Sequence, residues 1–219
     1  MIRTTFILLL LVIQTATLLA EEHCRRVQLN GTVQFVPAPG PGFRGTVNAP
    51  EGEFKIELLF RENGGEPISQ KNFIELTDIK SHSFGGAKEC TVSLPEAARK
   101  PRSFTVSAEL MPYNVVSKYG SDPKEHVSDQ LDFSVKPLPP MSPISYSSQC
   151  EGGKAAQLSD FGASYNQLLL PLATRRYVLS IELNKAGKNA GPDQLDVLNG
   201  RAKFTWEDLQ TMVPCSSFE

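Results

Sequence analysis

The sequence predicts a mainly β protein built from antiparallel strands. Two observations carry this prediction: apolar residues recur at every second position in several segments, and glycine- and proline-rich turns separate those segments. A strand that is apolar on alternate residues packs one face on a core and turns the other to solvent, as antiparallel sheets commonly do. We therefore expect an antiparallel β-sandwich followed by a smaller α+β part at the C-terminal end.

The strongest alternation occurs in five segments. In the first, the apolar face places Asn30 and Thr32 on the opposite, solvated side of the strand. The apolar faces of the five segments are Val27, Leu29, Val33 and Phe35; Phe54, Ile56, Leu58 and Phe60; Phe104, Val106, Ala108 and Leu110; Leu131, Phe133 and Val135; and Tyr177, Leu179, Ile181 and Leu183. Weaker strand candidates cover residues 43–47, 72–77, 90–94 and 202–205.

Helix is expected only in short pieces. Asp122-Pro123-Lys124-Glu125 combines an N-cap residue, a proline at the first helical position and a glutamate at the third, which predicts a short helix. A second helix is predicted to open at Thr205-Trp206-Glu207-Asp208 and to stop before Pro214. For residues 153–170 helix and coil both stay open.

The chain divides into four stretches: a signal peptide at 1–20, a β-sandwich domain at 21–136, a proline-rich linker at 137–149 and a small β/α part at 150–219 that packs on the first. The sandwich domain has the size of an immunoglobulin-like or fibronectin-like sandwich. No tryptophan precedes Trp206, and Cys90 has no partner at inter-sheet spacing. The prediction therefore covers the architecture and not the family, and a single composite domain stays open.

The first twenty residues have the layout of a secretory leader. A positive start at Arg3 precedes an apolar run at 6–13, and small Ala16 and Ala20 offer cleavage points. The run alone is shorter than the roughly 20 apolar residues that span a bilayer, although an uncleaved anchor stays open. We expect a secreted, extracellular protein without a membrane span. The formal net charge of −2 argues against nucleic acid as a partner.

Four cysteines, Cys24, Cys90, Cys150 and Cys215, are widely spaced and predict two disulfides in an oxidising compartment. The favoured pairing is Cys24–Cys90 with Cys150–Cys215, because it would hold each half of the chain separately. The alternative, Cys24–Cys215 with Cys90–Cys150, would join the two ends of the mature chain. Asn30-Gly31-Thr32 is a glycosylation sequon, so we expect a glycan on Asn30.

No catalytic motif emerges from the sequence, so we expect no enzyme and no cofactor. Serine-hydrolase, zinc-protease and nucleotide-binding signatures are all missing from the chain. One acidic stretch could hold a metal ion, but a solvated helix followed by a solvated strand face explains it better, and no metal is expected. The stretch consists of Asp122, Glu125, His126, Asp129 and Asp132.

Three further features suggest binding. Basic groups at 25–26, 99–102 and 175–176 could together attract an anionic glycan or lipid headgroup, although ordinary solubilising charge is the preferred interpretation. The proline-rich loop Ala38–Arg44 is a stiff candidate recognition loop. Phenylalanines at core-facing strand positions could line a lipid cavity, but a filled core explains them equally well. The five are Phe35, Phe54, Phe60, Phe104 and Phe133.

The predicted function is that of a non-enzymatic extracellular binding or structural protein that acts through loops and sheet faces. Its partner would be an extracellular protein or a matrix component. Two alternatives stay open. The first is a carrier of a small apolar ligand in a cavity between the sheets. The second is an extracellular hydrolase, which would need His82 or His126 beside a carboxylate and a hydroxyl, or a protease inhibitor that uses the loop Ala38–Arg44.

Overall fold

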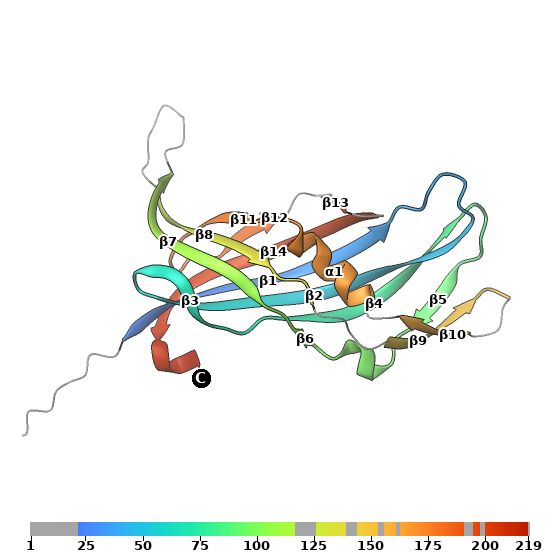
Figure 1. Ribbon diagram of the computed structural model, residues 1–219, viewed down its shortest axis with the longest axis horizontal. Coiled ribbons are helices and arrows are strands. Elements are labelled where there is room, and N and C mark those ends of the chain that lie inside the picture. The colour runs from blue at the N-terminus through green and yellow to red at the C-terminus, as the bar shows by residue number, and fades with distance from the viewer. Residues whose placement is uncertain are drawn as a thin grey trace, which may run out of the picture.

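A long, twisted antiparallel sheet dominates the computed structural model (Figure 1). The structure describes residues 22–116, 126–138, 144–152, 156–160, 163–190, 195–197 and 200–218. The expected signal peptide at 1–20 and the expected helix start at Asp122 lie outside these residues. The prediction of a mainly β, antiparallel fold is confirmed.

The large sheet contains β1 (His23–Pro37), β2 (Gly45–Arg61), β3 (Gly64–Gln70), β4 (Phe73–Phe84), β6 (Arg102–Ser103), β7 (Val106–Val116), β8 (His126–Val135), β11 (Tyr177–Ile181), β12 (Gly187–Ala190), β13 (Leu195–Val197) and β14 (Gly200–Pro214). A small sheet contains β5 (Cys90–Ser93), β9 (Ile144–Cys150) and β10 (Ala156–Asp160). The helical elements are η1 (Glu96–Arg99), α1 (Ala163–Ala173) and η2 (Cys215–Phe218).

The large sheet curls into a nearly closed barrel. Its strands follow the order β11-β8-β7-β3-β2-β1-β14-β12, and β4 also pairs with β2. Beyond β11 the chain crosses to β14, where Leu183 forms an isolated bridge with Gln210. The expected immunoglobulin- or fibronectin-like sandwich is not confirmed, because one continuous sheet forms most of the wall.

Aromatic side chains fill the barrel where β8 and β11 lie over β14. The rings of Phe133 and Tyr177 stack with centroids 5.2 Å apart, and those of Phe204 and Trp206 stack at 5.4 Å. Edge-to-face contacts of Tyr177 with both β14 rings, each at 5.8 Å, join the two stacks. The four side chains are at most 6 % exposed, so this part of the core is packed.

The helix predicted at Thr205-Trp206 is wrong, because these residues lie within β14. Trp206, Leu209 and Val213 are spaced like one face of a helix, but the whole segment pairs with β1 in an unbroken antiparallel register. Asp208 and Gln210 are polar although both are buried. The sequence of this strand therefore lacks the regular alternation of apolar and polar residues that would identify it. Pairing with a strand more than 170 residues away overrides the local helical signal.

The open question at 153–170 is resolved by α1. Its side chains Tyr165, Leu168, Leu169 and Leu172 are all buried against the inner side of the sheet. Gly52 on β2 makes room for the helix, since a Cβ there would lie 2.7 Å from Leu168 Cδ1. No helix in the described part of the chain has the length and apolar character needed to span a membrane.

Tyr165 anchors the surroundings of α1. Its hydroxyl donates to the Ala98 carbonyl of η1 at 2.9 Å and accepts from the Leu76 N–H of β4 at 3.4 Å. Through Tyr165, α1 therefore contacts η1 and β4, while β11, β12, β13 and β14 belong to the large sheet. β9 covers the second half of the predicted linker, while residues 139–143 lie outside the described residues.

The two predicted disulfides are confirmed, but the favoured pairing is wrong. Cys24 bonds to Cys215, and Cys90 bonds to Cys150. The physical reason is strand pairing: β1 and β14 are neighbours, so the first and last cysteines meet, while Cys90 and Cys150 face each other directly in β5 and β9. The favoured pairing assumed two separately closed halves, which the shared sheet contradicts.

We predict that removing the Cys24–Cys215 disulfide destabilises the protein more than removing Cys90–Cys150. The bonds span 191 and 60 residues. The chain-entropy model then assigns them about 5 and about 4 kcal/mol. Urea unfolding of the double serine variants Cys24→Ser/Cys215→Ser and Cys90→Ser/Cys150→Ser measures both losses. A non-reducing peptide map of the parent that linked Cys24 to Cys90 would contradict the connectivity itself.

A second prediction concerns the buried hydroxyl of Tyr177, which donates to the Pro171 carbonyl at 2.6 Å. Burial raises the pKa of Tyr177 to about 12, although nearby Arg175 slightly lowers it. The folded state thus holds this proton more tightly than the unfolded chain, whose tyrosines titrate near about 10. The linked stability is complete below about pH 10 and is lost as pH rises through about 12.

Urea unfolding across this alkaline range should therefore show a shallower loss of stability in Tyr177→Phe than in the parent. Absorbance titration of the folded protein supplies an independent readout. If every tyrosine ionised near about pH 10 while the protein stayed folded, the burial effect would be refuted.

Candidate functional site

The outward side of the long strands forms a broad polar surface, which we call the outer polar face. Alternation along β1 turns Val27, Leu29 and Val33 into the core and leaves the residues between them outside. The face consists of Lys188 of β12; Lys203, Thr205 and Glu207 of β14; Asn30, Thr32 and Gln34 of β1; Glu51, Glu53 and Lys55 of β2; and Phe73, Glu75 and Thr77 of β4.

Strand register arranges these side chains in three rows across β14, β1 and β2. The first row is Lys203–Gln34–Glu51, the second is Thr205–Thr32–Glu53, and the third is Glu207–Asn30–Lys55. β12 extends the third row with Lys188 beside Glu207, and β4 extends it with Phe73 beside Lys55. The hydrogen-bonded strands thus determine the order of charge and amide groups in each row.

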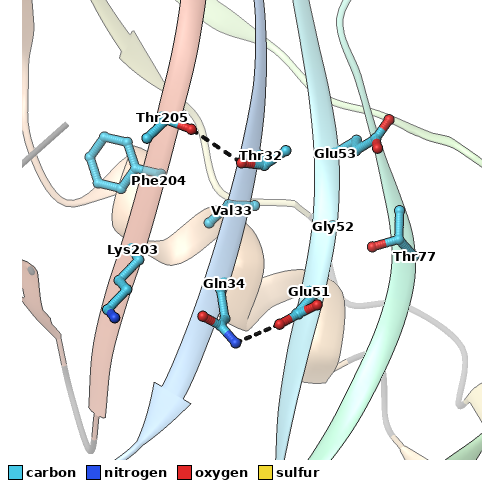
Figure 2. A pocket seen from close by; sticks show the side chains of 10 residues that line it. All are labelled: Thr32, Val33, Gln34, Glu51, Gly52, Glu53, Thr77, Lys203, Phe204 and Thr205. Atoms are coloured by element: carbon cyan, nitrogen blue, oxygen red, sulfur yellow. Dashed lines mark hydrogen bonds between the residues drawn. The ribbon is translucent and has the colours of Figure 1, made fainter. Parts of the chain in front are cut away.

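Two adjoining clefts hollow this face. The first has a volume of about 370 Å³, and Figure 2 shows Gln34, Glu51 and Lys203 around it. The second has a volume of about 540 Å³ and is lined by Asn30, Lys188 and Glu207, among others. Thr32 and Thr205 border both clefts, so the clefts form one continuous concavity across β1 and β14.

Part of this surface is already hydrogen-bonded. The hydroxyls of Thr32 and Thr205 lie 3.2 Å apart, joining β1 to β14 (Figure 2). One carboxylate oxygen of Glu51 accepts from Gln34 Nε2 at 2.5 Å and from Lys80 Nζ at 2.6 Å. The hydrogen bond that Lys80 donates to Glu51 raises the pKa of Lys80, and the charges of Glu51 and Asp78 add to this effect.

Other groups on the face have no side-chain partner within the described residues. Within the described residues, the side chains of Glu53, Thr77 and Lys203 make no hydrogen bond or ion pair with another side chain. They surround the first cleft, where Figure 2 shows Glu53 and Thr77 on the opposite side of β1 from Lys203. The cleft therefore offers a carboxylate, a hydroxyl and an ammonium group to a polar partner.

The sequon falls on the outer polar face. Asn30 and Thr32 both point outward and are exposed, as the alternation predicts. Gly31 points inward, where a Cβ would lie 2.4 Å from both Phe54 Cζ and the Thr205 carbonyl oxygen. A glycan on Asn30 would stand in the second cleft. Glycosylation of this residue stays a prediction.

The acidic stretch does not converge on one point. Asp129 accepts from Arg25 and, at 2.8 Å, from Gln210 Nε2 inside the barrel. Asp132 instead pairs with Arg176. Asp122 and Glu125 lie outside the described residues, as does the side chain of His126. Within the described part of the chain, no group of three His, Cys, Asp or Glu side chains could hold a metal ion.

The other sequence candidates lie elsewhere. Arg25 is buried in its ion pair, and Arg176 is bonded to Asp132, so these two cations are already committed. The loop Ala38–Arg44 is held by a hydrogen bond from Phe43 N–H to the Gly40 carbonyl at 3.2 Å, and its Phe43 ring meets Phe84 edge-on at 6.3 Å. The five phenylalanines named above are at most 7 % exposed and belong to the core.

Of the two histidines that the hydrolase alternative could use, His82 has a described side chain, and it does not line either cleft. His82 belongs to β4 and pairs with Val47 of β2. Its Nε2 atom is buried and has no hydrogen-bond partner in the described part of the chain.

Comparison with known proteins adds no functional assignment. The chain matches no protein-family model, no curated protein and no solved structure.

Sequence reasoning missed the outer polar face as a site. The alternation at 27–35 and 54–60 identifies solvated positions, but it does not say which positions of separate strands lie side by side. The missing information is the register of β14 on β1, and the helix predicted at Thr205 concealed it.

The two ion pairs of β8 lead to a third prediction. The side chains of Arg25 and Asp129 are each 9 % exposed, whereas that of Arg176 is 67 % exposed. Asp129→Asn should cost about 3–5 kcal/mol, because it removes the negative charge that Asp129 supplies to the buried guanidinium of Arg25. Asp132→Asn should cost less, because solvent screens Arg176. Urea unfolding compares these matched variants, and an equal or reversed order of losses would refute the difference.

Proposed function

We propose that this chain is a secreted, non-enzymatic binding protein whose outer polar face contacts an extracellular protein or matrix component. The observation that carries the proposal is the continuous concavity across β1 and β14, bordered by the uncommitted groups of Glu53, Thr77 and Lys203. A partner that supplies a cation, a hydroxyl and an anion at matching positions would satisfy all three.

The construction of the face supports such a role. Its side chains stand on long strands that pair over many residues, so their positions are largely set before a partner arrives. Little ordering entropy is then lost on association, which favours affinity from a modest number of polar contacts. Backbone hydrogen bonds also hold the rows of opposite charge at constant spacing.

The leader and the cysteines support secretion as part of this proposal. Two disulfides are consistent with an extracellular location, because oxidising compartments allow them to form and persist. The same compartment would permit a glycan on Asn30. Its occupancy would decide how much of the outer polar face a partner can reach.

The packed interior favours a binding protein over a carrier of small apolar ligands. The aromatic cluster occupies the space between the β8–β11 layer and β14, and the leucines of α1 cover the neighbouring part of the sheet. In this described part of the interior, side chains take the space that a carrier would leave open. Within the described residues, no contact around His82 or the loop Ala38–Arg44 favours the hydrolase or inhibitor alternative.

Site-specific photo-crosslinking in cells that secrete the protein tests this proposal. A photoreactive residue replaces Lys203 on the outer polar face or Val178 on β11, which is 55 % exposed and serves as the matched control. We expect crosslinked adducts from position 203 and few or none from position 178. Equal yields, or adducts from position 178 alone, would refute the outer polar face as the binding surface.

A further inference from the structure

The three rows of the outer polar face are complementary to themselves. In the first row a lysine and a glutamate lie on either side of Gln34, and in the third row a glutamate and a lysine lie on either side of Asn30. β1, the central strand, contributes an uncharged side chain to every row: Gln34, Thr32 or Asn30. The first and third rows therefore both consist of a cation, an amide and an anion, but they run in opposite directions.

Such rows match a second copy placed face to face by a two-fold axis that runs parallel to β1. The rotation lays β14 of one copy over β2 of the other while keeping every row in place. Lys203 then faces Glu51, Glu207 faces Lys55, and Thr205 faces Glu53. Within each copy Glu207 already pairs with Lys188 and Lys55 with Glu57, so the contact adds a second counter-charge to Glu207 and to Lys55. Each contact occurs twice, because the interface is the same patch on both copies.

The ends of the third row also match under this rotation. Lys188 of β12 comes to face Phe73 of β4, whose ring is exposed. An ammonium group over an aromatic ring is attractive. Along the axis, Asn30 and Gln34 meet their own copies, and side-chain amides can donate to and accept from each other.

The available area fits a weak, concentration-dependent contact. From Asn30 to Gln34 the three rows extend about 17 Å along β1 and about 24 Å across five strands, roughly 400 Å² for each copy. Stable interfaces bury about 800 Å² on each partner, and weak, transient ones bury less. η2 limits the face beyond this stretch, because Phe218 packs on Cys24 and Leu59 on the outward side of the sheet.

We propose that a second copy of this chain docks on the outer polar face in this two-fold arrangement, and that a glycan on Asn30 prevents it. The proposal rests on the proposed function, since it names the partner of the same face. Asn30 lies on the axis, so the glycans of the two copies would meet between the two faces and hold them apart. The unglycosylated protein would therefore dimerise, and the glycosylated protein would stay a monomer.

Sedimentation velocity of the secreted, glycosylated protein and of the Asn30→Gln variant tests the proposal. We expect the glycosylated protein to be a monomer and Asn30→Gln to dimerise with rising concentration. Monomers in both forms would overturn the proposal, and so would dimers of equal strength in both. If only the glycosylated form dimerised, the assigned interface would also be wrong.

A charge swap in the Asn30→Gln background tests the geometry. Lys203→Glu places like charges together at two points and should weaken dimerisation at least about tenfold. Adding Glu51→Lys should restore most of the lost affinity, because the reversed charges again face each other. Val178→Glu on β11 is the matched control and should leave dimerisation unchanged. Circular dichroism verifies folding of each variant. Failure of the double variant to recover would refute the arrangement.

Repeating the crosslinking experiment with Asn30→Gln separates this inference from the proposed function. Adducts of the Asn30→Gln chain from position 203 with twice the mass of the chain support the second copy. Adducts of another mass, with monomers in sedimentation, leave the outer polar face as a binding surface but overturn self-association. The absence of adducts from position 203 in both the parent and Asn30→Gln overturns both.

Discussion

The pairing of β1 with β14 is the constraint on which the rest of the structure depends. The two strands run antiparallel from His23 opposite Pro214 to Pro37 opposite Gly200 without a register shift. This pairing brings the two ends of the described chain together and continues the sheet from β2 to β12. The Cys24–Cys215 bond closes the same end, and a hydrogen bond from Cys215 N–H to the Glu22 carbonyl at 2.9 Å extends the contact.

β1 and β14 contribute side chains both to the core and to the outer polar face. Inward, Phe204 and Trp206 of β14 pack on Tyr177, which brings the β8–β11 layer against β14. Outward, Thr32 and Thr205 join the strands at the centre of the concavity. A shift of the register by one residue would turn the core side chains outward and the polar side chains inward. Packing of the core therefore also fixes which side chains form the outer polar face.

A buried polar cluster continues the interior beyond the aromatic rings. Arg25 of β1, Asp129 of β8 and Gln210 of β14 come from three strands and are bonded to one another through Asp129. Burying these charges is costly, and the pairing offsets that cost only in this geometry. The cluster therefore favours one arrangement of the β8 layer relative to β1 and β14, which in turn helps to maintain the curvature of the outer polar face.

The sequence by itself determined the β class, the faces of the main strands and the number of disulfides. These properties are local or compositional: alternation at Val27, Leu29 and Val33 predicts which side of the strand is buried, whatever its neighbours are. Only the tertiary structure decided which cysteines pair, that Trp206 lies in a strand, and which polar groups share a row. Each of these depends on the register between separate segments, from 17 residues apart for Gln34 and Glu51 to 191 for Cys24 and Cys215, and no local pattern specifies such a register.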